Sequence, residues 1–196
     1  MRKNYLLIVF MLIICITGCN GKNEVQKEKL KCDVFKCIEL IDYTDKVESI
    51  NDKIGITSKK NEYVNNSYEW DLSSDVKLRA TYGADGITTL ELIFDKSRLN
   101  DETINTSSFK NLDSDAIWNK LFGEGHSGYK NAVAVLGKEG TIISRKYMNF
   151  NGTMTITTDY LWIKNDKCYI RGSYDQDDHW AGSEIMAGTD VKDAQC

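Results

Sequence analysis

Apolar residues recur with two different periods along this chain. Within residues 42–55, Val47, Ile50 and Ile54 follow one another at three- and four-residue steps, which is typical of one face of an α-helix. Within residues 76–82, apolar side chains alternate with polar ones, which indicates a half-buried antiparallel strand. The same two patterns return in the same order later in the chain, so the pattern predicts helices packed on antiparallel strands, twice over.

Two pairs of helices are expected. Gly55 and Gly137 follow the second helix of each pair and are suited to end it, and Asp42 or Thr44 can cap the start of the helix that Gly55 ends. The four predicted helices cover residues 32–41, 42–55, 113–123 and 127–137.

The strand that follows each pair belongs to an ungapped repeat with an offset of 92 positions. Residues 68–86 and 160–178 share five residues at equivalent positions: Tyr68 and Tyr160, Trp70 and Trp162, Arg79 and Arg171, Tyr82 and Tyr174, Asp85 and Asp177. In the first copy, a turn at 83–86 leads to a return strand at 88–95. The second copy has a longer hairpin at 141–159, and its last segment, 179–191, alternates so poorly that we expect an incomplete sheet there.

These patterns predict an α+β fold of two tandem modules, each of two helices packed on a small antiparallel sheet. The first module covers residues 32–100 and the second covers 108–196. Residues 20–31 are polar and charged and are expected to form a tether.

The first 19 residues are expected to be an export signal. Arg2 and Lys3 precede an apolar stretch that is short for a membrane span. The ending, residues 16–19, resembles the lipobox of bacterial lipoproteins, which implies a diacylglycerol on Cys19. Two acyl chains suffice for stable anchoring. We therefore expect a chain held on the outer side of the cell membrane through Cys19.

Four cysteines remain after the signal, and an exported chain allows them to form disulfides. Proximity in the sequence favours Cys32 with Cys37 and Cys168 with Cys196, and free buried thiols are the alternative. The Cys-x4-Cys spacing is wrong for a zinc knuckle. No metal and no cofactor are predicted.

Composition and motifs argue against two classes of function. The net charge is −4 and no basic stripe is visible, so nucleic acid is not an expected partner. Residues 107–110 match the Ser-x-x-Lys of penicillin-recognising enzymes, but the companion motifs are missing. Residues 174–179 gather carboxylates and an imidazole without the spacing of a cation loop, which favours a solvated turn. We expect no catalytic activity, with a cell-surface hydrolase as the least favoured alternative.

The repeated aromatic and arginine residues are the candidate partner-binding set. The tryptophans and tyrosines either fill the core between helices and sheet or anchor a partner. The arginines alternate with the apolar set, so they face outward, where they either keep the protein soluble or line a binding surface. The set is Tyr68, Trp70, Arg79, Tyr160, Trp162 and Arg171.

The order of helix, Gly, Tyr-x-Trp and strand, carried twice behind a lipobox, resembles the β-lactamase inhibitor protein fold and the similar module of outer-membrane assembly lipoproteins. It also resembles tandem-repeat lipoproteins of low-GC Gram-positive bacteria. In the inhibitor, two modules form a concave sheet that grips a protein partner. The resemblance therefore implies a non-catalytic protein- or peptide-binding role through the sheet faces, with a structural or assembly role in the cell envelope as the alternative.

Overall fold

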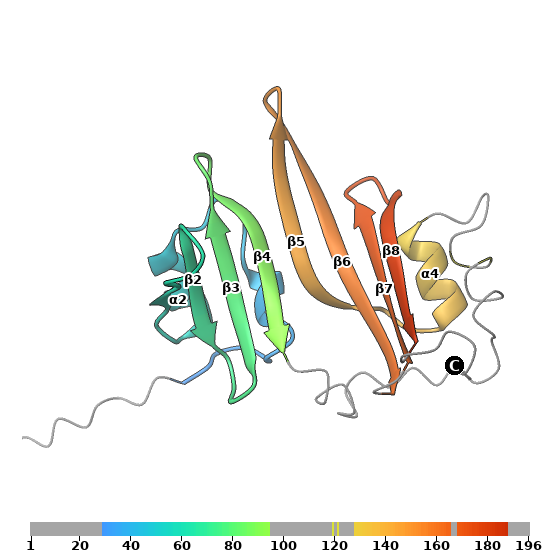
Figure 1. The fold of residues 1–196 in the computed structure, drawn as a ribbon, viewed down its shortest axis with the longest axis horizontal. Coiled ribbons are helices and arrows are strands. Elements are labelled where there is room, and N and C mark those ends of the chain that lie inside the picture. The colour runs from blue at the N-terminus through green and yellow to red at the C-terminus, as the bar shows by residue number, and fades with distance from the viewer. Residues whose placement is uncertain (1–28, 95–118, 120, 122–127, 166–167, 188–196) are drawn as a thin grey trace, which may run out of the picture.

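Eight antiparallel strands form one sheet in the computed structural model of this chain, which describes residues 29–94, 119, 121, 128–165 and 168–187. The strands follow one another across the sheet in chain order (Figure 1). They are β1 (Lys59–Lys60), β2 (Ser67–Asp71), β3 (Val76–Tyr82), β4 (Ile87–Phe94), β5 (Thr141–Phe150), β6 (Thr153–Asn165), β7 (Cys168–Asp175) and β8 (Trp180–Ala187).

The expected fold class, two α+β modules of two helices each, is wrong. The described residues form a largely β fold in which one continuous sheet carries two α-helices, α2 (Val47–Ile54) and α4 (Tyr129–Leu136), and one short 3-10 helix, η1 (Cys37–Leu40). Only residues 119 and 121 of the helix expected at 113–123 are described. Both are helical, and Leu121 is buried.

The helix expected at 32–41 shrinks to η1 because of a local disulfide. Cys32 and Cys37 are bonded, and their Cα atoms lie 5.5 Å apart. Five residues of α-helix rise by about 7.5 Å along the axis alone, so this bond is incompatible with a helix through both cysteines. The chain turns instead, with the Phe35 backbone N–H donating to the Asp33 carboxylate.

Both α-helices end where the sequence predicted. Gly55 and Gly137 adopt left-handed conformations with φ of 83° and 72°, and each N–H returns to a carbonyl of the last helical turn. The predicted N-cap of α2 is wrong, since Lys46 occupies that position without a side-chain cap. Asp42 instead accepts hydrogen bonds from the backbone and hydroxyl of Thr44 in the preceding turn.

The described helices pack on one face of the sheet, because the apolar residues that alternate along the strands point to that face. The side chains of α2 lie with β2–β4 in one core, and those of α4 lie with β6 and β7 in another. Fully buried residues of these two cores include Ile50, Ile54, Trp70, Leu78 and Leu90 in the first and Ala132, Leu136, Trp162 and Ile170 in the second.

The repeated tryptophans tie the sheet to the helix ends. The Trp70 indole N–H donates to the Asn51 side chain in α2 at 2.7 Å, and the Trp162 indole N–H donates to the Lys138 carbonyl just after α4 at 2.9 Å. Gly140 is needed for this approach, since a Cβ there would lie 2.7 Å from the Trp162 ring. The tryptophan therefore has the same structural role in both copies of the repeat.

The expectation of an incomplete second sheet is also wrong. β8 pairs with β7 from the Cys168–Ala187 pair to the Tyr174–Trp180 pair, with one bulge. The small residues around Gly182 hide the alternation in the sequence, but an outer strand needs only backbone pairing on one side. Within the described part of the chain, none of the helices has the length and apolar character to cross a membrane.

The strands β4 and β5 join the two halves of the sheet through only three residue pairs. Thr89, Leu90 and Glu91 lie opposite Lys146, Arg145 and Ser144. On both sides of this contact the two strands continue without pairing to each other, and Figure 1 shows them diverging. The contact therefore makes one sheet but leaves the strand ends apart.

We expect Trp70→Phe to lower the free energy of unfolding by about 1–3 kcal/mol, because it removes a buried hydrogen bond and core volume. Tyr63→Phe is the control, since Tyr63 is 94% exposed and its change should stay within about 0.5 kcal/mol. Urea unfolding measures both variants. Equal midpoints for the two variants would contradict the role given to the indole.

Candidate functional site: the open face of the sheet

The candidate site is the sheet face opposite the helices, here called the open face. Lys77 and Arg79 point to this side, as the alternation predicted, while Leu78 between them is buried in the core. One row of directly opposed residues crosses the open face from β2 to β7: Glu69, Arg79, Glu91, Ser144, Asp159 and Ser173.

In the first half of the sheet, the charged residues of this row are paired with one another and with Lys77. Both the Nε and the Nη2 of Arg79 donate to one oxygen of Glu69, at 2.9 and 2.7 Å, and its Nη1 lies 3.4 Å from Glu91. Lys77 lies 3.3 Å from Glu69, and Asn61 donates to the same carboxylate. The arginine is therefore held by its neighbours before any partner arrives.

These contacts shift the acid–base behaviour of Glu69. Burial alone would raise the pKa of its carboxyl group, but hydrogen bonds from Arg79, Asn61 and Lys77 outweigh it and lower the pKa. The charged form of Glu69 is thus favoured by folding.

In the second half of the sheet, the matching arginine uses a different acid. Asp159 is completely buried, and it accepts hydrogen bonds from the Arg171 guanidinium and, at 2.6 Å, from the Ser173 hydroxyl. The repeat offset places Leu161 where Glu69 stands, and Asp159 where Ser67 stands. In the second copy the carboxylate therefore lies two residues earlier in the strand than in the first copy. It is on the same face and still reaches the repeated arginine, Arg171.

The structure places the repeated aromatic residues on the helix-covered side of the sheet. Trp70 and Trp162 are completely buried there, which is the core alternative. Tyr68 and Tyr160 are half-buried on the same covered side, where the Tyr68 ring contacts Tyr82 edge-on, 5.9 Å between centroids. Residues two apart on a strand share a face, so each tyrosine lies on the same face as the tryptophan of its copy.

Tyr160 stacks on Tyr129 of α4, with ring centroids 4.0 Å apart. Burial, as the main cause, raises the pKa of Tyr129 to about 12 and that of Tyr160 above its usual value. These two tyrosines help to line a second hollow of about 420 Å³ on the covered face. Of the six predicted residues, only Arg79 and Arg171 lie on the open face.

Two exposed apolar residues on the open face were not predicted from the sequence. Met148 and Phe150 lie on β5 near its end, and they are 56% and 74% exposed. The available signal was the run from Tyr147 to Phe150, in which three of four residues are apolar, so that both faces of a strand there carry large apolar side chains. Exposed large apolar side chains that lie close together often mark a contact surface.

These side chains border a groove of about 860 Å³ between the β3–β4 turn and the β5–β6 hairpin. The rings of Tyr43 and Tyr147, 5.8 Å apart, line it from the covered side. The Asn149 side-chain amide donates to the Asp85 carboxylate across it, at 3.2 Å. The two hairpins are thus connected beyond the point where β4 and β5 stop pairing, and a hollow remains between them.

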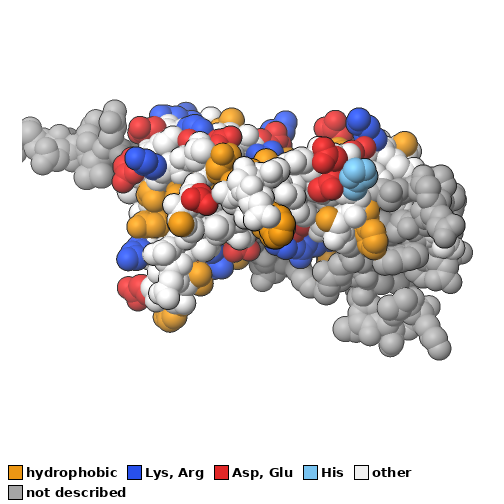
Figure 2. All heavy atoms as spheres, turned by 90° about the horizontal axis from the view of Figure 1, so that it is seen from above, with side chains coloured by type: hydrophobic (Ala, Val, Ile, Leu, Met, Phe, Trp, Pro, Cys, Tyr) orange, Lys and Arg blue, Asp and Glu red, His pale blue; other side chains and the backbone are white. Residues whose placement is uncertain are grey.

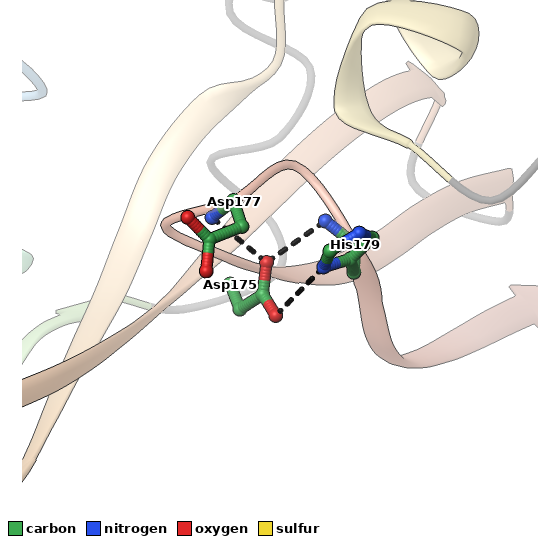
Figure 3. Close-up of side chains that lie close together, drawn as sticks. All are labelled: Asp175, Asp177 and His179. Carbon is green, nitrogen blue, oxygen red and sulfur yellow. Dashed lines mark hydrogen bonds and ion pairs between the residues drawn. The ribbon is translucent and has the colours of Figure 1, made fainter.

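The acidic turn between β7 and β8 serves the fold. Asp175, Asp177 and His179 bring their ligand atoms within 4.8 Å of one another (Figure 3). However, Asp175 already accepts the backbone N–H groups of Asp177 and His179 and lies 3.4 Å from the imidazole, contacts that lower its pKa. Asp178 accepts the Lys130 N–H at the start of α4. Asp175 therefore closes the turn, and the neighbouring Asp178 binds a backbone N–H in the first turn of α4.

Figure 2, viewed towards the hairpin ends, shows acidic side chains gathered beside the histidine of this turn. Elsewhere in this view, basic and acidic side chains are interspersed. On the side seen in Figure 2, the described residues therefore present no continuous basic patch.

The remaining predicted sites are only partly described. The bond between Cys32 and Cys37 is present, as noted above. Cys168 begins β7, but its partner in the predicted pairing, Cys196, lies outside the described residues, as do Cys19, His126 and the Ser-x-x-Lys match at 107–110. Neither a scan against protein-family models nor a search of curated proteins finds a match to this chain.

We expect Arg171→Ala to destabilise the fold more than Arg79→Ala. Among the described residues, the first change leaves the buried Asp159 carboxylate with the Ser173 hydroxyl alone, which should cost about 3 kcal/mol. Glu69 keeps Lys77 and Asn61 after the second change, which should cost about 1 kcal/mol. Urea unfolding at pH 7 compares the two variants. Equal losses would show that Asp159 is not dependent on Arg171.

The lowered pKa of Glu69 predicts how the free energy of unfolding depends on pH. Because its folded pKa is lowered, its contribution to stability is present above the unfolded value near 4.5 and is lost as the pH falls through the folded pKa. Wild type should therefore exceed Glu69→Gln in unfolding free energy at pH 6, and the difference should shrink by pH 3. Urea midpoints at several pH values measure it, and a constant difference would contradict the assignment.

Proposed function

We propose that this chain is a lipid-anchored extracytoplasmic protein that binds a protein or peptide partner, without catalysis, through the open face of its sheet. The observation that carries the proposal is the exposed pair Met148 and Phe150 beside the groove between the hairpins. The α-helices α2 and α4 pack on the other face. On β6 and β7 the open face is partly covered, since Leu161 and Tyr169 are buried there against Phe35 and Phe94, so the part available to a partner is the hairpin end of β5. The residues ahead of Cys19 support the anchored location, because they combine an export signal with the lipobox-like ending.

The apolar pair is better placed to supply binding energy than the repeated arginines. Arg79 and Arg171 are already paired with Glu69 and Asp159, so a partner that used them would have to replace existing contacts. Met148 and Phe150 have most of their surface available, and burying apolar surface contributes about 25 cal/mol per Å². The paired charges then form a polar surround to the apolar contact, as is usual in protein interfaces.

The test starts from heptapeptides selected from a displayed random library on the full chain in detergent micelles. The best binder is synthesised with a fluorescein label, and its affinity is measured by fluorescence anisotropy. Phe150→Ser and Met148→Ser should each weaken binding about tenfold or more, because each removes buried apolar contact.

Tyr63→Ser and Leu40→Ser are the matched controls, since both residues are exposed apolar side chains away from the groove. They should leave the affinity unchanged. The proposal fails if no selected peptide binds saturably, or if the control variants lose as much affinity as the β5 variants.

A further inference from the structure

β5 continues past the end of its pairing with β4. The last pair between them is Thr89 with Lys146, yet β5 extends to Phe150. Residues 147–150 are paired to β6 on one side. On the other side, within the part of the chain that the structure describes, they border the groove rather than a strand. This segment is therefore a strand edge inside the sheet.

The β5–β6 turn determines which backbone groups point into the groove. Phe150 and Thr153 flank the two-residue turn of Asn151 and Gly152, which has φ of 52° and 84°. In such a hairpin the flanking residues hydrogen-bond to each other, and along the strand the bonding direction alternates. The N–H and C=O groups of Tyr147 and Asn149 consequently point away from β6, towards the groove.

We propose that an extended peptide segment of the partner adds to this edge as a β-strand, in the groove between β4 and β5. The inference rests on the binding function proposed above and specifies its partner. Backbone hydrogen bonds to Tyr147 and Asn149 would supply affinity, and alternate side chains would supply specificity. Alternation directs one set towards Met148 and Phe150 on the open face and the other towards the ring of Tyr43.

The groove also defines the chemistry of this segment. Its lining is mostly apolar or hydroxyl-bearing, and Asp85 and Lys146 contribute one negative and one positive charge. Asp85 already accepts the Asn149 amide. An uncharged, extended segment with apolar side chains on both faces therefore fits better than an acidic or basic peptide.

The outer edge at β1 offers less to such a segment. β1 has only two residues, Lys59 and Lys60, and both are exposed. Short edge strands and lysines are the usual protection against strand addition. The edge at β8 is longer, so the test must separate it from β5.

The experiment uses the labelled heptapeptide selected on the full chain and compares Asn149→Pro with Asn149→Ala. Proline removes an N–H that points into the groove without breaking the β5–β6 ladder, so Asn149→Pro should weaken binding about tenfold or more. Asn149→Ala keeps the N–H and loses only the side-chain bonds to Asp85 and to the Gly152 N–H, so it should bind at least about fivefold more tightly than Asn149→Pro. Unchanged circular dichroism checks that both variants fold.

A second measurement uses the unaltered protein, so it does not depend on how the proline variant folds. The peptide is N-methylated at one residue at a time, and methylation at every second position should abolish binding, because only alternate N–H groups face β5. If this period of two is absent, or if Asn149→Pro binds like Asn149→Ala, strand addition at β5 is wrong, although saturable binding would leave the wider function standing. If methylation at every second position abolishes binding but Asn149→Pro binds as tightly as Asn149→Ala, the peptide pairs with the edge at β8 and not with β5.

Discussion

The short contact between β4 and β5 is the constraint on which the rest of this structure depends. Its three residue pairs turn two groups of strands into one sheet and align Glu91 with Ser144, so that a single polar row crosses the open face. Because the contact is short, the side of β5 that faces β4 has no strand partner beyond Lys146 among the described residues, and the groove lies there between the hairpins. A longer pairing would close the groove, and a shorter one would leave two separate sheets.

The repeat preserves the covered side of the sheet more strictly than the open side. Trp70 and Trp162 each bind a helix or its end through the indole N–H, so the covered side keeps its residues. On the open side the arginine stays while its acid moves, from the partly exposed Glu69 to the buried Asp159. Scaffold contacts need a fixed position, whereas an ion pair on a flat surface needs only a carboxylate within reach of a long side chain.

Period and turn chemistry predicted β3, β4, β7, the β5–β6 hairpin and both helix ends, because these features depend on neighbouring residues. They did not predict β1 or a complete β8. The prediction of a helix at 32–41 was wrong for a reason that lies in the sequence. A disulfide between Cys32 and Cys37 is incompatible with a helix through both residues. The continuous sheet was not predictable, because periodicity does not tell which of two distant strands will pair, here Leu90 with Arg145. Because the pairing of β4 with β5 was not predicted, the groove between their hairpins and the exposed position of Met148 and Phe150 beside it were not predicted either.

Native-state hydrogen exchange of the β5 amides, followed by NMR, tests the central claim most directly, because it asks whether a free strand edge exists before any partner binds. The geometry predicts slow exchange at Arg145, which faces β4, and at Met148, which faces β6. It predicts fast exchange at Tyr147 and Asn149, even though Tyr147 has a buried side chain. Uniform protection from Arg145 to Asn149 would show that the edge is already occupied and would contradict the account.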